Sequence, residues 1–319
     1  MKDKDAFLSR NDYVIRVLDS PGEVSARAWN QLLFAQAQAT PFMRHEYLNA
    51  LHASACAAPQ TGWTPRFFLL ERGDQLAAAC VVYLKSHSRG EYVFDWSWAN
   101  AYAQHGLAYY PKAVLAVPFT PVPGARLLAR TQADRALLAQ ALLDWCASQQ
   151  LSGLHQLFLA DEDVAVCCRV GMLQRHTVQF HWSNSTPGYA SFDDFLATLS
   201  QEKRKKIRQE RRKVAQAGVV FRVVEGTDIS SADWDFFFRC YERTYMEHGN
   251  APYLNREFFQ HMAQDMPQHW VMFIAEQAGQ PIATSLIAIN ASCTSAADPI
   301  NQNNIKRVAY GRYWGALKP

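Results

Sequence analysis

The order of strand and helix patterns is the most constraining feature of this chain. An apolar strand pattern at 13–18 precedes two amphipathic helix patterns at 25–36 and 43–54, the first with Ser25 as its N-cap. Two β-rich runs follow at 67–71 and 75–85, and the Arg-Gly-Asp between them is a hairpin signal. A mixed order with a hairpin in its middle predicts α/β layers around one mixed sheet.

The remaining patterns complete this first series and then begin it again. Up to residue 182 they predict strands at 113–117, 155–160 and 173–182, and helices at 131–149 and 161–170. After a linker at 184–191 and a basic helix, the strand, two helices and hairpin recur at 219–224, 234–247, 255–265, 270–276 and 281–290. A polar loop at 291–304 and a strand at 305–314 follow. We therefore predict a complete module at 1–184 and a partial second copy at 191–319, although the halves share no obvious identity.

Composition narrows the class of protein. The 319 residues predict about two domains, and 49% hydrophobic residues indicate a globular chain. A net charge of +3 is too small to imply DNA or another nucleic acid as a partner for the chain as a whole. The seven cysteines are odd in number and form no CxxC pair, which favours a reducing compartment. With no signal peptide and no apolar run of membrane-spanning length, we expect a cytoplasmic protein.

The first candidate site is an aromatic stretch between residues 92 and 112. Aromatic rings with polar tips suit a cleft that stacks sugars or other flat groups, and a histidine exchanges protons near neutrality. The alternative is an aromatic plug that closes the sheet edge. Candidate catalytic residues are His105, Tyr110 and Lys112, and candidate substrate-binding residues are Trp96, Trp98, Tyr102 and Tyr109.

The second candidate is the Pro/Gly loop at 118–128. It lies just before a predicted helix, where backbone amides favour anions, and Arg126 would add a bidentate contact. Because its three prolines remove amide donors, a rigid turn with a surface arginine is the alternative. We expect Arg126 to converge with His105, Tyr109, Tyr110 and Lys112 on one pocket.

The third candidate is the basic helix after the linker. Eight basic residues and one acidic residue lie between residues 203 and 213, so several helix faces are positive. Such a helix suits a phosphate-bearing partner such as a tRNA, a nucleotide donor or a lipid pyrophosphate, and a solvated helix between modules is the alternative. The candidate donor- or phosphate-binding residues are Lys203, Arg204, Lys206, Arg208 and Arg212.

The fourth candidate joins a helix of the second half to the last strand. Glu242 and Tyr245 lie three residues apart and share a helix face, and Arg312 and Tyr313 lie on the strand. A carboxylate with tyrosines and an arginine suits the orientation of an amine or a sugar. The sequence contains no Ser/His/Asp order, metal-ligand cluster or phosphate-binding loop of the Walker type, so it predicts no metal and assigns no catalytic base.

Several of these strings together resemble the FemAB-like family. They are WSWANAYAQHGLAYYPK, VPFTPVPGARLL, QFHWSN, SFDDFLATLSQEKRKKIRQERR, TYMEHGNAPYLNREFF and YGRYWG, and they extend over residues 13–315. The family is described as peptidoglycan biosynthesis or recognition proteins of the acyl-CoA N-acyltransferase superfamily. The resemblance implies tandem acyltransferase-like modules with a cleft between them.

The resemblance also implies two functions. One is transfer of an acyl or aminoacyl group to an amine of a cell-wall precursor, with acyl-CoA or aminoacyl-tRNA as the donor substrate and no tightly bound cofactor. The other is recognition of peptidoglycan or another glycan without catalysis. Family members continue beyond YGRYWG, so we expect a shortened second module with an exposed aromatic edge near 310–314 and little transferase activity.

Overall fold

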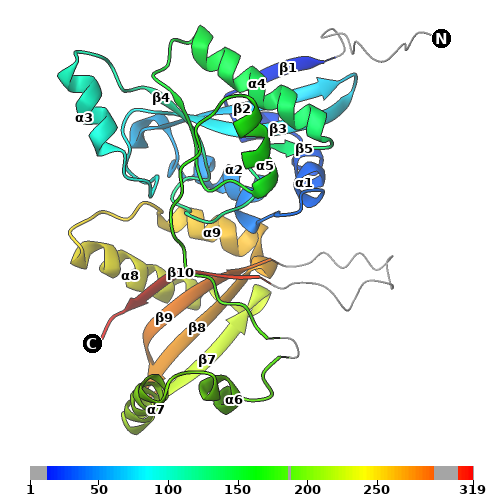
Figure 1. Ribbon diagram of the computed structural model, residues 1–319. Helices are drawn as coiled ribbons and strands as arrows, with labels where there is room; N and C mark the ends of the chain where they lie inside the picture. The colour runs from blue at the N-terminus through cyan, green and yellow to red at the C-terminus, as the bar shows by residue number, and fades with distance from the viewer. Residues whose placement is uncertain (1–12, 186–187, 291–307, 319) are drawn as a thin grey trace.

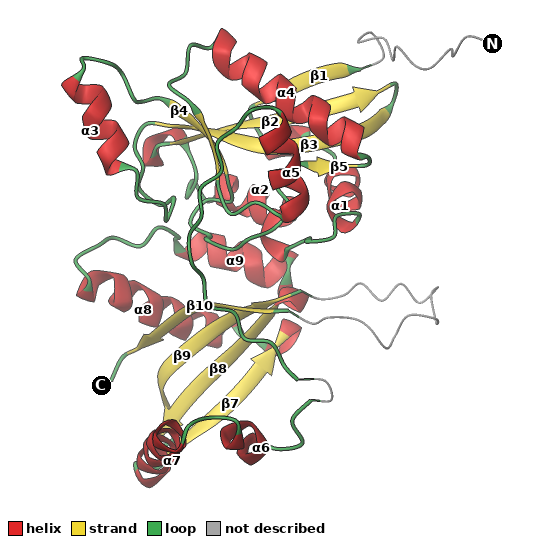
Figure 2. Ribbon diagram, viewed as in Figure 1, coloured by secondary structure: helices red, strands yellow, loops and turns green. Residues whose placement is uncertain are grey.

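The computed structural model describes residues 13–185, 188–290 and 308–318. Its elements form two modules, each built on its own sheet (Figures 1 and 2). Those of the first module are β1 (Val14–Leu18), α1 (Ala26–Phe34), α2 (His45–Ala53), β2 (Trp63–Arg72), β3 (Gln75–Lys85), α3 (Trp96–Gln104), β4 (Lys112–Leu115), β5 (Leu128–Ala129), α4 (Gln132–Ser148), β6 (Leu154–Gln156) and α5 (Asp161–Arg169). Those of the second are α6 (Phe192–Ala197), α7 (Gln201–Gln216), β7 (Val219–Glu225), α8 (Ser231–Glu247), α9 (Arg256–Asp265), β8 (Trp270–Gln277), β9 (Gln280–Ile289) and β10 (Ala309–Ala316).

The two sheets repeat one topology. The first has the order β1-β2-β3-β4-β6, antiparallel except for the parallel pair β4 and β6, and β5 also pairs with β3. The second has the order β7-β8-β9-β10 and is antiparallel throughout. In both modules two helices separate the first strand from the hairpin. The predicted fold class, a mixed α/β arrangement of tandem modules, is confirmed, whereas the boundaries at 184 and 191 remain a prediction.

The first sheet is buried on both faces. Phe67, Leu69 and Val81 pack with α1 and α2 on one face, and the alternate residues Phe68 and Val82 pack with α4 on the other. Alternation along a strand explains why hydrophobic residues run without interruption through this hairpin.

The second sheet differs on one face. Met272, Ile274 and Leu286 are buried beneath α8 and α9, which correspond in order to α1 and α2. The opposite face carries Phe221 and Val223, which are exposed, and no described helix covers it as α4 covers the first sheet. Trp314 pairs with Ser285 across the strands and is also exposed. Tyr310 and Tyr313 pack against the core. The exposed aromatic edge expected near 310–314 therefore consists of Trp314.

Three expectations about secondary structure need correction. The aromatic stretch contains a helix, α3, that periodicity did not reveal. The strand expected at 155–160 is shorter and lies at Leu154–Gln156. No strand forms at 173–182, because the alternating apolar side chains there have no sheet to pack against, and Phe180 is 98% exposed. The loop expected at 291–304 and the start of the strand expected at 305–314 lie outside the described residues.

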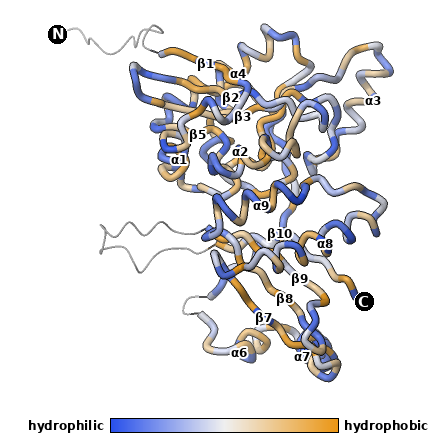
Figure 3. Tube along the Cα trace, turned by 180° about the vertical axis from the view of Figure 1, so that it is seen from behind, coloured by the Kyte–Doolittle hydropathy of each residue, from blue (hydrophilic) through white to orange (hydrophobic). Residues whose placement is uncertain are grey.

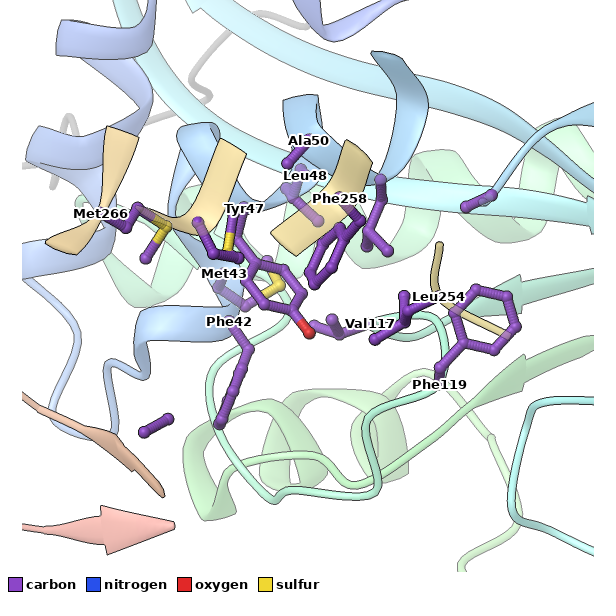
Figure 4. Packing of buried hydrophobic residues seen from close by; sticks show 14 of the residues in the cluster. Phe42, Met43, Tyr47, Leu48, Ala50, Val117, Phe119, Leu254, Phe258 and Met266 are labelled. Atoms are coloured by element: carbon purple, nitrogen blue, oxygen red, sulfur yellow. The ribbon is translucent and has the colours of Figure 1, made fainter. Parts of the chain in front are cut away.

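The modules share one hydrophobic core. Figure 4 shows Tyr47 of the first module beside Phe258 of α9, with Phe42 on the other side of Tyr47. The rings of Tyr47 and Phe258 meet edge to face with their centroids 5.3 Å apart, and those of Phe42 and Tyr310 do the same at 5.3 Å. Buried residues of both modules belong to a single cluster. The modules are therefore joined by apolar packing and not only by the linker.

This shared core predicts cooperative unfolding. Replacing the fully buried Phe258 by Ala should lower the free energy of unfolding by about 3–5 kcal/mol, because a large ring leaves a cavity in the interface. Phe34→Ala is the matched control, since Phe34 is 51% exposed, and it should change stability by less than about 1 kcal/mol. Chemical denaturation would measure both. Two separate transitions, with only one shifted by Phe258→Ala, would contradict a shared core.

Candidate functional site

A pocket of about 290 Å³ lies between the two modules. The first module contributes the turn before α3 and the loop after β4, and the second contributes α8 and β10. The lining residues are Tyr92, Pro121, Tyr241, Thr244, Tyr245, Arg312, Tyr313 and Trp314. Its walls are therefore mainly phenol rings around one guanidinium group.

Local geometry brings α8 and β10 close enough to form one wall. Tyr241, Thr244 and Tyr245 lie at i, i+3 and i+4 and so share a helix face. The Thr244 hydroxyl donates to the Trp314 carbonyl over 3.3 Å. A Cβ atom at Gly315 would lie 2.4 Å from the Cys240 carbonyl oxygen. Only glycine permits this approach, which places Arg312 and Tyr313 beside the helix.

Arg312 has no carboxylate partner within the described parts of the chain. Its Nη2 donates to the Phe119 carbonyl over 2.7 Å and to the Tyr313 hydroxyl over 3.4 Å, and its buried Nε has no hydrogen-bond partner. Burial acts to lower the pKa of Arg312, but nearby tyrosine oxygens, chiefly those of Tyr313 and Tyr47, raise it overall. A permanent positive charge thus faces the pocket without a counter-charge from the protein.

The surrounding phenols are held in their protonated form. Burial, reinforced by neighbouring phenols, raises the pKa of Tyr92 and Tyr241 far above the usual range. Burial also raises the pKa of Tyr313, although Arg312 acts in the opposite direction. At neutral pH these hydroxyls are hydrogen-bond donors. Together with the arginine they form a site suited to negatively charged or oxygen-rich groups.

A second cluster of charges is buried in the first module around Lys112. Its ammonium group donates to Ser88 Oγ over 2.9 Å and to Glu91 Oε2 over 2.8 Å, and it forms a short ion pair with Asp95. The Tyr109 hydroxyl also donates to Asp95, over 2.6 Å. Burial acts to raise the pKa of Asp95, but its hydrogen bond with Lys112 lowers it overall. Lys112 is therefore occupied by structural partners.

Lys85 holds the same segment from the neighbouring strand. Its ammonium lies 3.5 Å above the Trp63 ring and donates to the Arg89 carbonyl over 3.2 Å. The Phe119 amide donates to the carbonyl of Gly90 over 3.2 Å. The two lysines thus fix the segment 88–95, which carries Tyr92 to the pocket between the modules.

The structure brings only part of the predicted first site together. Lys112 and Tyr109 belong to the buried cluster, and Tyr110 joins it through Ser88, whose hydroxyl lies 2.7 Å from the Tyr110 oxygen. His105 is exposed at the end of α3 and makes no side-chain contact with the cluster. Trp96 and Trp98 are exposed on α3, and Tyr102 donates to the Ser152 carbonyl.

Arg126 also lies apart from this cluster, so the expected convergence on one pocket is wrong. Its guanidinium donates to the Val122 carbonyl over 2.5 Å, and its backbone amide donates to Asp163 over 2.6 Å. It is buried, which excludes the surface arginine of the alternative interpretation. Hydrogen bonds to the loop itself and to α5 explain its position.

The structure brings most of the fourth predicted group together in the pocket between the modules. Tyr245, Arg312 and Tyr313 all line the pocket, whereas Glu242 does not. Tyr92 and Pro121 were missed as lining residues because they come from the other module. Their only sequence signal was membership of the aromatic stretch and the proline loop, which does not reveal that the two modules pack at this point.

The basic helix α7 lies away from this pocket. Figures 1 and 3 place it at the end of the second module remote from the first, and Figure 3 shows it as mainly hydrophilic. The side chains of Lys203, Arg208 and Arg212 are at the surface. Any role of α7 in binding is therefore separate from the pocket around Arg312.

The described residues offer neither a metal site nor a membrane-spanning helix. No group of three or more His, Cys, Asp or Glu side chains there is placed to hold a metal ion. In the same residues, no helix has the length and apolar character needed to cross a membrane.

The fold defines a protein of two tandem mixed α/β modules with a tyrosine-lined pocket between them. The family model FemAB-like, described as peptidoglycan biosynthesis/recognition, matches residues 20–319. The chain therefore belongs to the FemAB-like family.

Comparison with solved structures gives a similarity at low sequence identity. Among solved structures, a crystal structure of FemX is similar at a TM-score of 0.43 and 8% sequence identity, over 82% of this chain and 58% of the FemX chain. The present chain thus spans less than two thirds of the length of that protein. A search of curated proteins finds no match.

Removing the Lys112 ammonium from the buried cluster should destabilise the folded protein. In Lys112→Met, Glu91 and Asp95 stay buried without the cation that pairs directly with them, so the free energy of unfolding should fall by about 3–5 kcal/mol. The triple variant with Glu91→Gln and Asp95→Asn should recover part of this loss, because no uncompensated charge remains. Urea denaturation would measure both variants. Equal instability of the two would mean that packing, and not charge, makes Lys112 necessary.

Lys85 should make stability depend on pH. Burial lowers its pKa to about 7, against an ordinary value of 10.5, so above pH 7 the unfolded chain binds more protons than the folded one. Its contribution to stability should therefore rise from pH 7 towards pH 10.5, by up to a few kcal/mol. Lys85→Met should lack this rise, and Lys205→Met, on exposed α7, should keep it. Denaturation midpoints at pH 6.5, 8 and 9.5 would decide, and parallel curves for all three proteins would refute the shift.

Proposed function

We propose that this chain is a cell-wall transferase that binds its acceptor in the pocket around Arg312. The reaction is transfer of an acyl or aminoacyl group to an amine of a peptidoglycan precursor, in the cytoplasm. Family membership supports the peptidoglycan connection. The observation that carries the assignment of the site is the guanidinium of Arg312, which faces a tyrosine-lined pocket without a carboxylate partner in the described structure.

The chemistry of the pocket selects an anionic acceptor. An arginine binds carboxylate and phosphate oxygens through paired N–H donors, and such bonds are about twice as strong as neutral ones. The protonated hydroxyls of Tyr92, Tyr241 and Tyr313 add donors around the same space. At about 290 Å³ the pocket is at the small end for ligand sites. It therefore suits one anionic part of a larger precursor.

The transfer itself needs no charged catalyst in this pocket. A neutral amine of the acceptor attacks the carbonyl of the donor, an acyl-CoA thioester or an aminoacyl-tRNA ester. The new C–N bond forms as the C–S or C–O bond breaks, and the amine proton passes to the leaving sulfur or oxygen. Positioning supplies much of the rate, and tyrosine donors stabilise the negative charge that develops on the carbonyl oxygen.

One observation favours recognition without catalysis as the second candidate. The described residues that line the pocket include no histidine or carboxylate, so no general base stands within it. In that case the same pocket would hold the precursor without acting on it.

Substitution of Arg312 tests the acceptor site. Arg312→Gln should weaken binding of a muramyl peptide at least tenfold, because truncating one partner of a buried charge contact is costly. Arg312→Lys should lose less, since it keeps the charge but not the paired geometry. Arg169→Gln, at an exposed position on α5, is the matched control. Isothermal titration calorimetry measures all four proteins, and unchanged affinity in Arg312→Gln would exclude this pocket.

Turnover separates the two candidates. The protein would be incubated with a muramyl peptide and either radiolabelled acetyl-CoA or aminoacyl-tRNA. Label transferred to the peptide, and lost in Arg312→Gln, supports the transferase. Binding that depends on Arg312 without transfer from either donor supports recognition.

A further inference from the structure

The segment 173–184 runs from the first module to the second as a strand without a partner (Figure 1). It contains neither helix nor turn, and apolar Val178, Phe180 and Trp182 alternate with polar residues, as in a strand. Its backbone N–H and C=O groups make no hydrogen bond to any other residue that the structure describes. A row of free main-chain donors and acceptors is therefore open to another chain.

Side chains hold one face of this segment against the first module. Gln179 Nε2 donates to the Pro121 carbonyl over 2.8 Å. The guanidinium of Arg175 lies over the Trp98 ring, 5.1 Å from its centroid. These two anchors are four residues apart and so point to the same side of an extended chain. Phe180, which follows Gln179 and points to the other side, is 98% exposed.

The segment passes the rim of the pocket around Arg312. Pro121, whose carbonyl receives the Gln179 hydrogen bond, is one of the residues that line that pocket. A ligand whose anionic part occupies the pocket would therefore extend past a backbone with unused hydrogen-bonding groups. Peptides bind such backbones by strand addition, in which main-chain bonds supply affinity and alternate side chains supply specificity.

The charge of the segment favours an anionic peptide. Between residues 170 and 192 the sequence contains no aspartate or glutamate, and its one permanently charged side chain is Arg175. A peptide that carries carboxylates would meet no like charge along this path.

We propose that residues 173–182 bind the peptide stem of the cell-wall precursor as an added β-strand. The inference rests on the proposed function, because it assigns the peptide part of the same acceptor whose anionic group lies at Arg312. Five extended residues span roughly 16 Å, about the length of 175–179. A peptide of that size would cover the anchored part of the segment.

A second copy of this chain is the competing occupant, since unpaired strands also pair with each other. Two observations disfavour it. Self-pairing would bring two copies of Arg175 to one interface with no carboxylate from either segment. A ribbon of two strands is also marginally stable in water unless something else holds it, as the pocket at Arg312 would hold a bound precursor.

Isothermal titration calorimetry with muramyl peptides of two, three and five stem residues tests the proposal. Affinity should rise with stem length, because each added pair of residues reaches further main-chain groups. Each backbone hydrogen bond should contribute roughly 2- to 10-fold. In Arg312→Gln the affinity should fall for all three peptides, while the gain with stem length stays.

Two proline variants probe the backbone directly. Proline removes an N–H donor, and neighbouring residues of a strand direct their N–H groups to opposite edges. Thr177→Pro and Val178→Pro therefore remove donors from different edges, and neither breaks a backbone hydrogen bond described in the free protein. One of them should weaken the pentapeptide roughly 2- to 10-fold more than the other. Each is the matched control for the other, and unchanged thermal unfolding would show that both fold.

The outcomes separate this inference from the assignment of the pocket. Equal affinities for the three stem lengths would overturn strand addition even if Arg312 proves essential for binding. Equal effects of the two prolines, or none, would also overturn it. Sedimentation velocity supplies the last test. A dimer that the prolines convert to a monomer, without a change in peptide affinity, would assign the segment to self-pairing instead.

Discussion

Apolar packing between the two modules determines where the pocket around Arg312 forms. Tyr47 and Phe258 meet at its centre, and Phe119 stacks on Tyr253 with ring centroids 4.9 Å apart. This packing brings the loop after β4 against β10, where the Phe119 carbonyl accepts a hydrogen bond from Arg312. Without it the tyrosines of α8 and the segment around Tyr92 would form no common pocket.

Buried charge in the first module supports the same pocket from behind. Lys85 and Lys112 occupy an otherwise apolar sheet, and their hydrogen-bond and ion-pair partners lie in one segment, 88–95. Buried charges are costly unless they are paired, so their interactions restrict this segment to one arrangement. A residue that looked catalytic in the sequence, Lys112, is therefore better understood as one that positions Tyr92.

Prediction from sequence succeeded where local pattern and tertiary packing agree. The hairpin of β2 and β3 and the helices α8 and α9 bury the faces that their periodicity indicated. It failed at α3, where aromatic content hid a helix, and at 173–182, where alternation suggested a strand. A strand needs a neighbour for its backbone groups, and alternation in one segment says nothing about whether a neighbour is present.

The sequence alone indicated most of the order of elements, the mixed α/β class and the family, because these depend on local periodicity and on strings of residues. It also marked Tyr245, Arg312 and Tyr313 as a group. The packing of the two modules was needed to show that Tyr92 and Pro121 join them, that His105 and Arg126 lie elsewhere, and that α7 lies away from the pocket. These relations join residues far apart in the chain, and they follow from how the modules and helices pack, which no local pattern encodes.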